Sequence, residues 1–534
     1  MRSTSVIVLG WIVSVASGCG SGSQTTPGMD VGGGSSSGSG SSTGSGSSSG
    51  SASSNSGGSS SGAGSSSGTA SSSGGSTGSG SGSDAGSSSG NSQGGGGDGG
   101  GGGCGAGDTN LPAEPTIPPA CTTLNASQSV ASGALPAEGT LDTSRIQSAL
   151  NGCASGQAVK LTAGGGNNSF ITGPLTLPAG VTLWVDAGAT LFGTRNPSVY
   201  GSAAALISVK GAHSGIVGDG VINGQGGEPK IGASTSFWDD NGSGGSSPAL
   251  IAVAGATDFT LYRITLHDAP MFHVKLAANG FVVWGVTVKT PSKSKNSAGT
   301  ALTPSVAHNT DGIDPGEAAS NGFIVCSSIS DGDDQIAIKG GTGVDKLTIA
   351  HNHFGAGHGM SIGSETNGGV SNVNVYDLSI DGTGTGLGGG SSNGIRIKSD
   401  ASRGGLVKDI TYSDVCVRDL ANPILLTPHY TTTSSVSLIP QYTGITIRNF
   451  HSLTTTVTPQ VTLDGYDANH TTGVTLDNVI VDGITSSKVT ASYANVTLGP
   501  GNVNFTPSGT GVAVTNTIAA GGAPNACTGK WVTF

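Results

Sequence analysis

The sequence predicts an all-β fold, a right-handed, single-stranded parallel β-helix closed at its N-terminal end by one short helix. Three observations support this. Short apolar runs with period-two alternation recur along the chain, often roughly 22 to 30 residues apart, and Gly, Asn, Asp or Ser bound them. Aromatic residues are few, and only one segment carries a convincing helix signal. Stacked coils of parallel strands have such a period, whereas a sandwich needs strands every 8 to 12 residues or so.

Residues 1–19 predict an export signal of lipoprotein type. Arg2 precedes an apolar stretch, residues 6–15, that is too short to span a membrane. The run Ala16-Ser17-Gly18-Cys19 resembles a bacterial lipobox, with Ala16 where Leu is usual, so a lipidated Cys19 would tether the protein to the membrane. Ordinary secretion is the alternative, and in both cases the protein is exported, either secreted or held at the bacterial cell surface.

Residues 20–108 are rich in Gly and Ser and predict a disordered linker, because they cannot bury a core. As a flexible coil, such a linker would separate its ends by roughly 50 to 60 Å and give reach from a tether. A linker without consequence is the alternative. Residues 109–534 then form one β-helix domain, which we expect to be a monomer.

The charge balance argues against one class of partner. Charged residues make up 10% of the chain, and the formal net charge is -11. A nucleic-acid binder normally presents a basic face, so no nucleic-acid partner is expected. An anionic ligand would need a locally basic cleft.

The cysteines favour disulfides. Seven are present, and setting Cys19 aside leaves an even number in an exported protein. Cys121 and Cys153 flank the first folded segment and are the best candidate pair. Buried free thiols are an equally good interpretation of Cys326 and Cys416. No spacing resembles a zinc site, and no metal or cofactor is expected.

The helix signal covers residues 145–150. Asp142 or Thr143 can cap it, and Ile146, Ala149 and Leu150 line one face. One short helix suffices to cover the end of a solenoid, which would otherwise expose strand edges and apolar core. The predicted strands follow at residues 181–185, 259–262, 281–284, 323–325, 347–349, 373–375, 410–412, 445–447 and 474–476.

Four motifs lie at spacings close to one coil. They are residues 309–314 (NTDGID), 332–339 (GDDQIAIK), 357–359 (GHG) and 396–398 (RIK). Asp311 and Asp333 are 22 residues apart (333 − 311), and Asp334 and His358 are 24 apart (358 − 334). Residues one coil apart lie on strands about 4.8 Å apart, so these side chains should form one patch. The longer step to Arg396 includes the Gly-rich residues 382–390, which can bulge out.

The residue types in this patch suit glycoside hydrolysis. Arg396 and Lys398 are two apart, so a strand turns both toward the same face. Three neighbouring carboxylates cannot all ionise freely, and the reaction needs one protonated and one ionised carboxyl group. Each motif alone is an ordinary turn or solvated strand. Polar residues of unrelated surface turns have no reason to align in one column, however, and the alignment therefore favours a functional site.

With these motifs, the sequence resembles the polygalacturonases of glycoside hydrolase family 28, especially the bacterial endo-acting branch. The resemblance covers roughly residues 121–480 and includes residues 121–124 (CTTL), 223–227 (NGQGG), 269–274 (APMFHV), 289–291 (KTP) and 357–365. It implies an enzyme that hydrolyses α-1,4-galacturonosidic bonds of polygalacturonate, a pectic polysaccharide, by an inverting acid/base mechanism without a metal.

The resemblance also implies roles for individual residues. Asp333 would be the proton donor, Asp311 and Asp334 would position and deprotonate water, and His358 would support the acid's protonation state. The substrate-binding residues would be Arg396, Lys398, Asn309, Tyr430 and Lys339, the first two through galacturonate carboxylates.

An inverting enzyme implies donor and water-activating carboxyl groups about 6.5 to 9.5 Å apart. Adjacent residues on a regular strand face opposite ways, so we predict a bend at Asp333 and Asp334 that aims both into the cleft.

Two departures from the family bear on subsite preference and on endo versus exo attack. Residues 292–307 form an insertion, and His308 stands where Arg is usual. The GHG motif favours unbranched polygalacturonate. Two alternatives are a calcium-dependent pectate or pectin lyase on the same fold and a non-catalytic β-helix that binds surface glycans.

Overall fold

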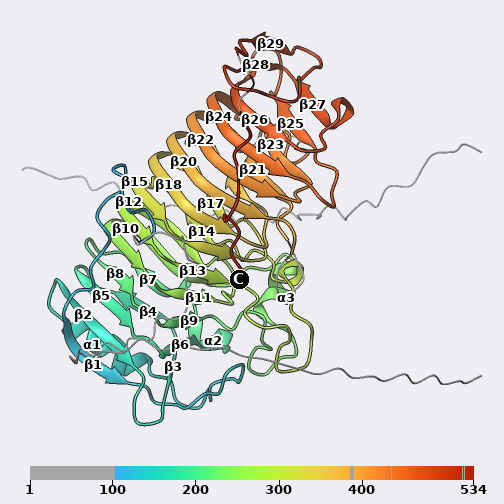
Figure 1. The fold of residues 1–534 in the computed structure, drawn as a ribbon. Helices are drawn as coiled ribbons and strands as arrows, with labels where there is room; N and C mark the ends of the chain where they lie inside the picture. Colours follow the sequence, from blue (N-terminus) through green and yellow to red (C-terminus); the bar gives the residue numbers. More distant parts are fainter. Residues whose placement is uncertain (1–102, 385–389, 434–435, 520, 522) are drawn as a thin grey trace, which may run out of the picture. The chain divides into compact units, whose positions relative to one another are not determined.

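The computed structural model describes residues 103–384, 390–433, 436–519, 521 and 523–534. The predicted export signal with Cys19, and linker residues 20–102, lie outside this range. Among the described residues, 29 strands join into one sheet, and every pairing between them is parallel. The parallel β-helix is therefore confirmed (Figure 1). Within the described ranges, no helix has the length and apolar character needed to cross a membrane.

The strand pairings form three columns that run along the helix. The first column contains β4 (Leu175–Leu177), β7 (Ala205–Val209), the start of β10 (Ala249–Tyr262), the start of β12 (Val274–Trp284), β14 (Ile313–Pro315), β17 (Ile336–Ile338), β19 (Met360–Ile362), β21 (Asn393–Lys398), β23 (Asn422–Thr427), β25 (Val461–Asp464) and β27 (Val489–Ser492).

The second column contains β1 (Ala120–Asn125), β2 (Gln157–Thr162), β5 (Val181–Val185), β8 (Gly215–Val217), the later parts of β10 and β12, β15 (Ser320–Val325), β18 (Val344–Phe354), β20 (Val370–Asp381), β22 (Leu406–Arg418), β24 (Gln441–Leu453), β26 (Thr472–Val481), β28 (Ala494–Leu498) and β29 (Ala513–Asn516). The third contains β3 (Ser169–Thr172), β6 (Thr190–Gly193), β9 (Val221–Asn223), β11 (Thr265–His267), β13 (Thr287–Lys289) and β16 (Ser328–Ser330), and continues into the end of β18.

The core follows from the alternation of side chains along each strand. Inward-facing Val, Ile and Leu of successive coils stack into one buried cluster along the helix interior. All the predicted strands are confirmed, and all of them lie in the second column.

Helix α1 (Thr143–Gly152) is confirmed at the N-terminal end, with Ile146 and Leu150 buried against the core. Asp142 occupies the N-cap but makes no side-chain capping bond. Its carboxylate instead accepts the backbone N–H of Ile171 at 2.9 Å and binds Arg145 at 2.7 Å. Two further short helices, α2 (Pro197–Tyr200) and α3 (Phe237–Gly242), were not predicted, although Ser236 and Asp239 form a capping box at α3.

Three disulfides join Cys104 to Cys326, Cys121 to Cys153 and Cys416 to Cys527. The predicted pair Cys121–Cys153 is confirmed. The interpretation of Cys326 and Cys416 as free thiols is wrong. Segments near both ends of the described chain lie over the second column, and their cysteines, Cys104 and Cys527, form the disulfides. The linker assignment of residues 103–108 is also corrected, since the disulfide of Cys104 fixes this stretch to the β-helix.

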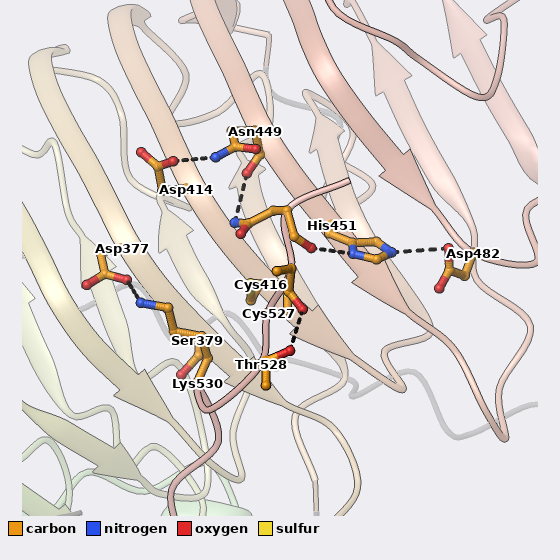
Figure 2. The surroundings of a disulfide bond; sticks show 12 residues. Asp377, Ser379, Asp414, Cys416, Asn449, His451, Asp482, Cys527, Thr528 and Lys530 are labelled. Carbon is orange, nitrogen blue, oxygen red and sulfur yellow. Dashed lines mark hydrogen bonds and ion pairs between the residues drawn. A yellow bond between two sulfur atoms is a disulfide. The ribbon is translucent and has the colours of Figure 1, made fainter. Parts of the chain in front are cut away.

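The C-terminal segment runs across the second-column strands β20, β22 and β24 (Figure 2). Beside the Cys416–Cys527 disulfide, Lys530 binds Asp377 at 2.6 Å, and the carbonyl of Asn525 lies 2.7 Å from a ring nitrogen of His451. The N-terminal segment reaches the same network, because Asp108 binds His351 at 3.0 Å, and His351 binds Asp377 at 2.6 Å.

The His351 network predicts a pH-dependent stability. The hydrogen bond to Asp377 raises the pKa of His351 against the opposing effect of burial. A raised folded-state pKa means that this stabilisation is complete below the ordinary histidine pKa of about 6.5 and is lost as pH rises through the folded-state value. We expect His351→Gln to lower the free energy of unfolding by roughly 1 kcal/mol at pH 5.5 and by less at pH 8.5. Urea unfolding at both pH values measures this, and an equal loss at both would contradict it.

Candidate functional site

The predicted site residues lie at the first column. Asp311 stands two residues before β14, Asp333 and Asp334 precede β17, and His358 precedes β19. The register Ile313 to Ile336 to Met360 places Asp311, Asp334 and His358 in one row across adjacent strands. A backbone hydrogen bond of 3.0 Å from Gly312 N–H to the Asp334 carbonyl continues that row. The structure thus brings together residues that the coil-length spacing had aligned.

The chain bends at Asp333 and Asp334, as predicted. Neither residue belongs to a strand, and the backbone N–H of Asp334 donates to the side chain of Asp333 at 3.0 Å. One oxygen of each carboxylate and one ring nitrogen of His358 lie within 4.8 Å of one another. This separation is shorter than the expected distance between a donor and a water-activating carboxylate, because both residues come from one bend.

Asp334 is bound by two cations. Lys398 Nζ lies 2.7 Å from one of its oxygens, while Arg396 at 3.2 Å and the Ser361 hydroxyl at 2.7 Å bind the other. Burial opposes ionisation, but Lys398 and Arg396 together hold the pKa of Asp334 well below its usual range. Because both oxygens already accept charge-assisted bonds, the group Asp333, Asp334 and His358 is a poor cation site despite its spacing.

Arg396 and Lys398 project from the same face of β21, while Ile395 and Ile397 face the core. Both cations are almost fully buried, with 10% and 6% of their side chains exposed. The two predicted cations therefore share one face of β21 and one carboxylate partner, Asp334.

Asp311 has the opposite electrostatic character to Asp334. Its burial, with a further contribution from Asp333, raises its pKa to about 7, although Lys339 at 3.2 Å opposes the rise. One of its oxygens has no hydrogen-bond partner among the described residues. Near neutral pH, Asp311 therefore carries a proton part of the time.

Asp333 and His358 form a close pair. Nδ1 of His358 lies 3.1 Å from the Asp333 carboxylate. Burial disfavours charge on both groups, yet this contact lowers the pKa of Asp333 and raises the pKa of His358. The protein groups alone thus place the shared proton on His358 rather than on Asp333.

Of the remaining predicted residues, Tyr430 and Lys339 contact this centre. Tyr430 is exposed, and its ring centre lies 5.3 Å from the Arg396 guanidinium carbon and 4.9 Å from Lys398 Nζ. Asn309 is half-buried, two residues before Asp311, with a φ of 57°. Lys339 follows β17 directly and binds Asp311. His308 is exposed at the end of the insertion, whose residues Leu302 and Ala307 pack on Trp238 of α3.

Sequence reasoning assigned no role to Asp314 and Asp331, which are buried beside the site. Burial, and then the charge of Asp311, raise the pKa of both groups well above the ordinary value. Each keeps one oxygen without a hydrogen-bond partner within the described part of the chain. Their positions in the sequence could have identified them as site residues, because Asp314 belongs to the NTDGID motif and Asp331 directly precedes the motif that begins at Gly332.

Comparisons with known proteins agree with this geometry. The family profile of "Glycosyl hydrolases family 28" matches residues 153–504. A polygalacturonase of Ralstonia solanacearum is 39% identical over 458 residues, which cover 75% of this chain and 85% of the relative. An endo-polygalacturonase of Pectobacterium carotovorum subsp. carotovorum is 38% identical over 397 residues, covering 70% and 89%. The solved polygalacturonase from Erwinia carotovora ssp. carotovora matches with a TM-score of 0.56 and 33% identity, over 76% of this chain and 100% of that one.

Proposed function

This chain belongs to glycosyl hydrolases family 28, and we propose that it hydrolyses α-1,4-galacturonosidic bonds of polygalacturonate by an inverting acid/base mechanism. One observation carries the proposal. Three aspartates from two adjacent coils meet beside a buried cation pair, so a reaction centre and a receptor for an anionic sugar share one row of strands.

Asp333 is the proposed proton donor. Its carboxylate and His358 share one proton across a contact of 3.1 Å, and this proton passes to the leaving glycosidic oxygen. A galacturonate carboxylate on Arg396 and Lys398 would cancel part of the positive charge that keeps the neighbouring carboxylates ionised. Substrate binding would therefore raise the pKa of Asp333 toward that of an acid catalyst.

Asp334 and Asp311 are the proposed water-holding groups. Asp311 has a pKa near 7 and one oxygen without a partner among the described residues, so its ionised form can accept the proton of water. Asp334, ionised and one strand away in the same row, helps to hold that water. The hydroxyl oxygen then bonds to the anomeric carbon as the bond to the leaving oxygen breaks. In this scheme, Arg396 and Lys398 bind a galacturonate carboxylate, and Tyr430, Asn309 and Lys339 complete a proposed substrate groove along the first column.

The stereochemistry of the product is a direct test. We expect proton NMR during the first turnovers of polygalacturonate to show new reducing ends in the β form, which later equilibrate, and no unsaturated product. New ends that first appear in the α form would reject inversion. The test is informative because the separation of Asp333 and Asp334 is shorter than the distance expected between the two carboxyl groups of an inverting enzyme. Unsaturated products whose formation stops with a chelator would instead support the lyase alternative.

Endo attack on unbranched polygalacturonate is also proposed, since a relative at 38% identity is named an endo-polygalacturonase. Mixed oligomers early in the same time course support it, and monomer or dimer alone would reject it.

Export is proposed on the three disulfides together with the predicted signal. Fractionation of cells that produce the full chain or Cys19→Ser would separate lipid anchoring from secretion.

A further inference from the structure

The loop that carries His358 joins β18 to β19 and contains three glycines in residues 355–359 (GAGHG). The His358 side chain is 44% exposed, and within the described part of the chain its ring makes one hydrogen bond, with Asp333. Glycine gives the backbone little conformational preference of its own. The distance between His358 and Asp333 therefore depends on the other groups that fix this loop.

Gln335 binds the loop at both of its ends. Its side chain is fully buried. The amide Nε2 donates to the carbonyl of Gly355 at 2.9 Å, and the amide Oε1 accepts the backbone N–H of Gly359 at 2.5 Å. One neutral side chain thus holds the backbone on either side of His358.

Gln335 also belongs to the bend that carries the carboxylates, because it follows Asp334 directly and precedes β17. The backbone N–H of His358 donates to the Asp333 carbonyl at 2.6 Å. A Cβ atom at Gly357 would lie 2.6 Å from both the Asp333 carbonyl oxygen and the Gln335 amide carbon, so the loop and the bend are in close contact. The amide of Gln335 therefore joins the two segments that supply the Asp333–His358 pair.

The two bonds of this side chain require an amide. A primary amide offers both a donor and an acceptor. An apolar side chain of similar size would deprive a buried carbonyl and a buried N–H of this partner, which is costly. An ionised carboxylate could not donate to Gly355, and it would add negative charge beside Asp333 and Asp334.

We propose that Gln335 is a positioning residue for the reaction, whose amide holds residues 355–359 so that His358 stays within hydrogen-bond distance of Asp333. Gln335 does not touch the substrate in this scheme and acts through His358 on the proposed proton donor. The inference rests on the proposed function, and it adds a buried, uncharged residue to the groups that set the rate. Loss of the amide should therefore affect the chemical step more than substrate binding.

Asn352 provides a matched control. It is a fully buried amide on β18, outside the first column. Its Nδ2 donates to the carbonyl of Ile324 at 2.9 Å, and its Oδ1 accepts the backbone N–H of Ser327 at 2.8 Å. Gln335→Met and Asn352→Leu thus remove the same two kinds of bond with little change in size, and each should lower the thermal midpoint by about 2 to 4 °C.

The kinetic constants of the two variants should differ. We expect Gln335→Met to lower kcat on polygalacturonate roughly tenfold or more, because His358 no longer keeps its place beside the donor, and to leave KM within about twofold of wild type. Asn352→Leu should keep wild-type kcat and KM. The inference is overturned if Gln335→Met keeps more than about half of wild-type kcat, or if Asn352→Leu loses as much kcat.

A conservative variant should restore part of the rate. At pH 5 a buried carboxyl group at position 335 is protonated, so it can donate and accept as the amide does. Gln335→Glu should therefore retain several times more kcat at pH 5 than Gln335→Met. Equal losses in these two variants would contradict the positioning role.

The pKa of His358 gives a readout that does not depend on turnover. Burial lowers this pKa, but the contact with Asp333 outweighs burial, and the charges of Asp334 and Arg396 also act on the ring. In Gln335→Met the pKa of His358 should fall toward the ordinary value of about 6.5. NMR titration of protein with labelled histidine measures it, and His358→Asn identifies the resonance.

This titration separates the inference from the proposed function. Asn352→Leu should leave the pKa of His358 unchanged. An unchanged pKa in Gln335→Met would reject the positioning role even if kcat falls. A wild-type protein that releases no reducing ends would reject hydrolysis, while the same titration still decides whether Gln335 positions His358.

Discussion

Replacing Asp333 by Asn is expected to lower kcat on polygalacturonate by roughly 10²- to 10⁴-fold, the usual contribution of a general acid. The amide has no proton to give to the leaving oxygen, yet its carbonyl oxygen can still accept the hydrogen bonds that Asp333 receives from Asp334 N–H and His358. The bend should therefore persist while the chemistry stops. Reducing-end release by the purified variant measures the rate, and circular dichroism with a thermal midpoint checks the fold.

A matched control removes a carboxylate of the same kind away from the groove. Asp409 is largely exposed on β22 in the second column, so Asp409→Asn should keep wild-type kcat. A folded Asp333→Asn that retains more than a tenth of wild-type kcat would remove Asp333 from the donor role. If neither variant changes the behaviour of the protein on pectin, the non-catalytic glycan-binding alternative gains support.

The sequence predicted one column of the helix well and missed the column that carries the chemistry. The second-column strands are long and alternate between buried and exposed positions, as in β22. The strands β14, β17 and β19 contain three residues each, and all of these are buried, so no alternation marks them. The site could still be predicted, because the spacing of its motifs depends on coil length and not on strand pattern.

The electrostatics of the site could not be predicted from spacing. Sequence alone does not tell that both oxygens of Asp334 meet Ser361 and two cations, or that Asp311 is enclosed and keeps one oxygen free. Those contacts decide which carboxylate is ionised. Long-range disulfides could not be predicted from the sequence either. The Cys104–Cys326 disulfide spans 222 residues and depends on a segment that the sequence had assigned to the linker.

Replacing Lys398 by Met is expected to destabilise the fold by about 3 kcal/mol and to lower kcat/KM by at least roughly 10²-fold. Asp334 and Lys398 have side chains that are 1% and 6% exposed, and removing one partner of a buried ion pair costs about 3 to 5 kcal/mol. Arg396 still binds Asp334, which places the expected loss at the lower end. The substitution lowers kcat/KM for two reasons, because the water-holding carboxylate of Asp334 and the substrate carboxylate both lose the cation of Lys398.

The pH dependence separates the structural part of this loss from the catalytic part. The pKa of Asp334 is depressed in the folded protein, so its stabilisation is present above the ordinary aspartate pKa of about 3.9 and is lost as pH falls through the folded-state value. Without Lys398 that folded-state pKa rises, and acid unfolding should begin at higher pH than in wild type. Urea unfolding from pH 3 to pH 7 measures the shift, with Lys408→Met, at an exposed position of β22, as the control.

The double variant Lys398→Met/Asp334→Asn then tests whether the cost lies in an uncompensated charge. If it does, neutralising Asp334 should return part of the lost stability, and the two substitutions should couple by more than about 0.5 kcal/mol, while kcat stays low because the water-holding carboxylate is gone. Strictly additive losses would mean that Lys398 stabilises the groove by packing alone. In that case its pairing with Asp334 could not be what keeps this carboxylate ionised beneath the substrate.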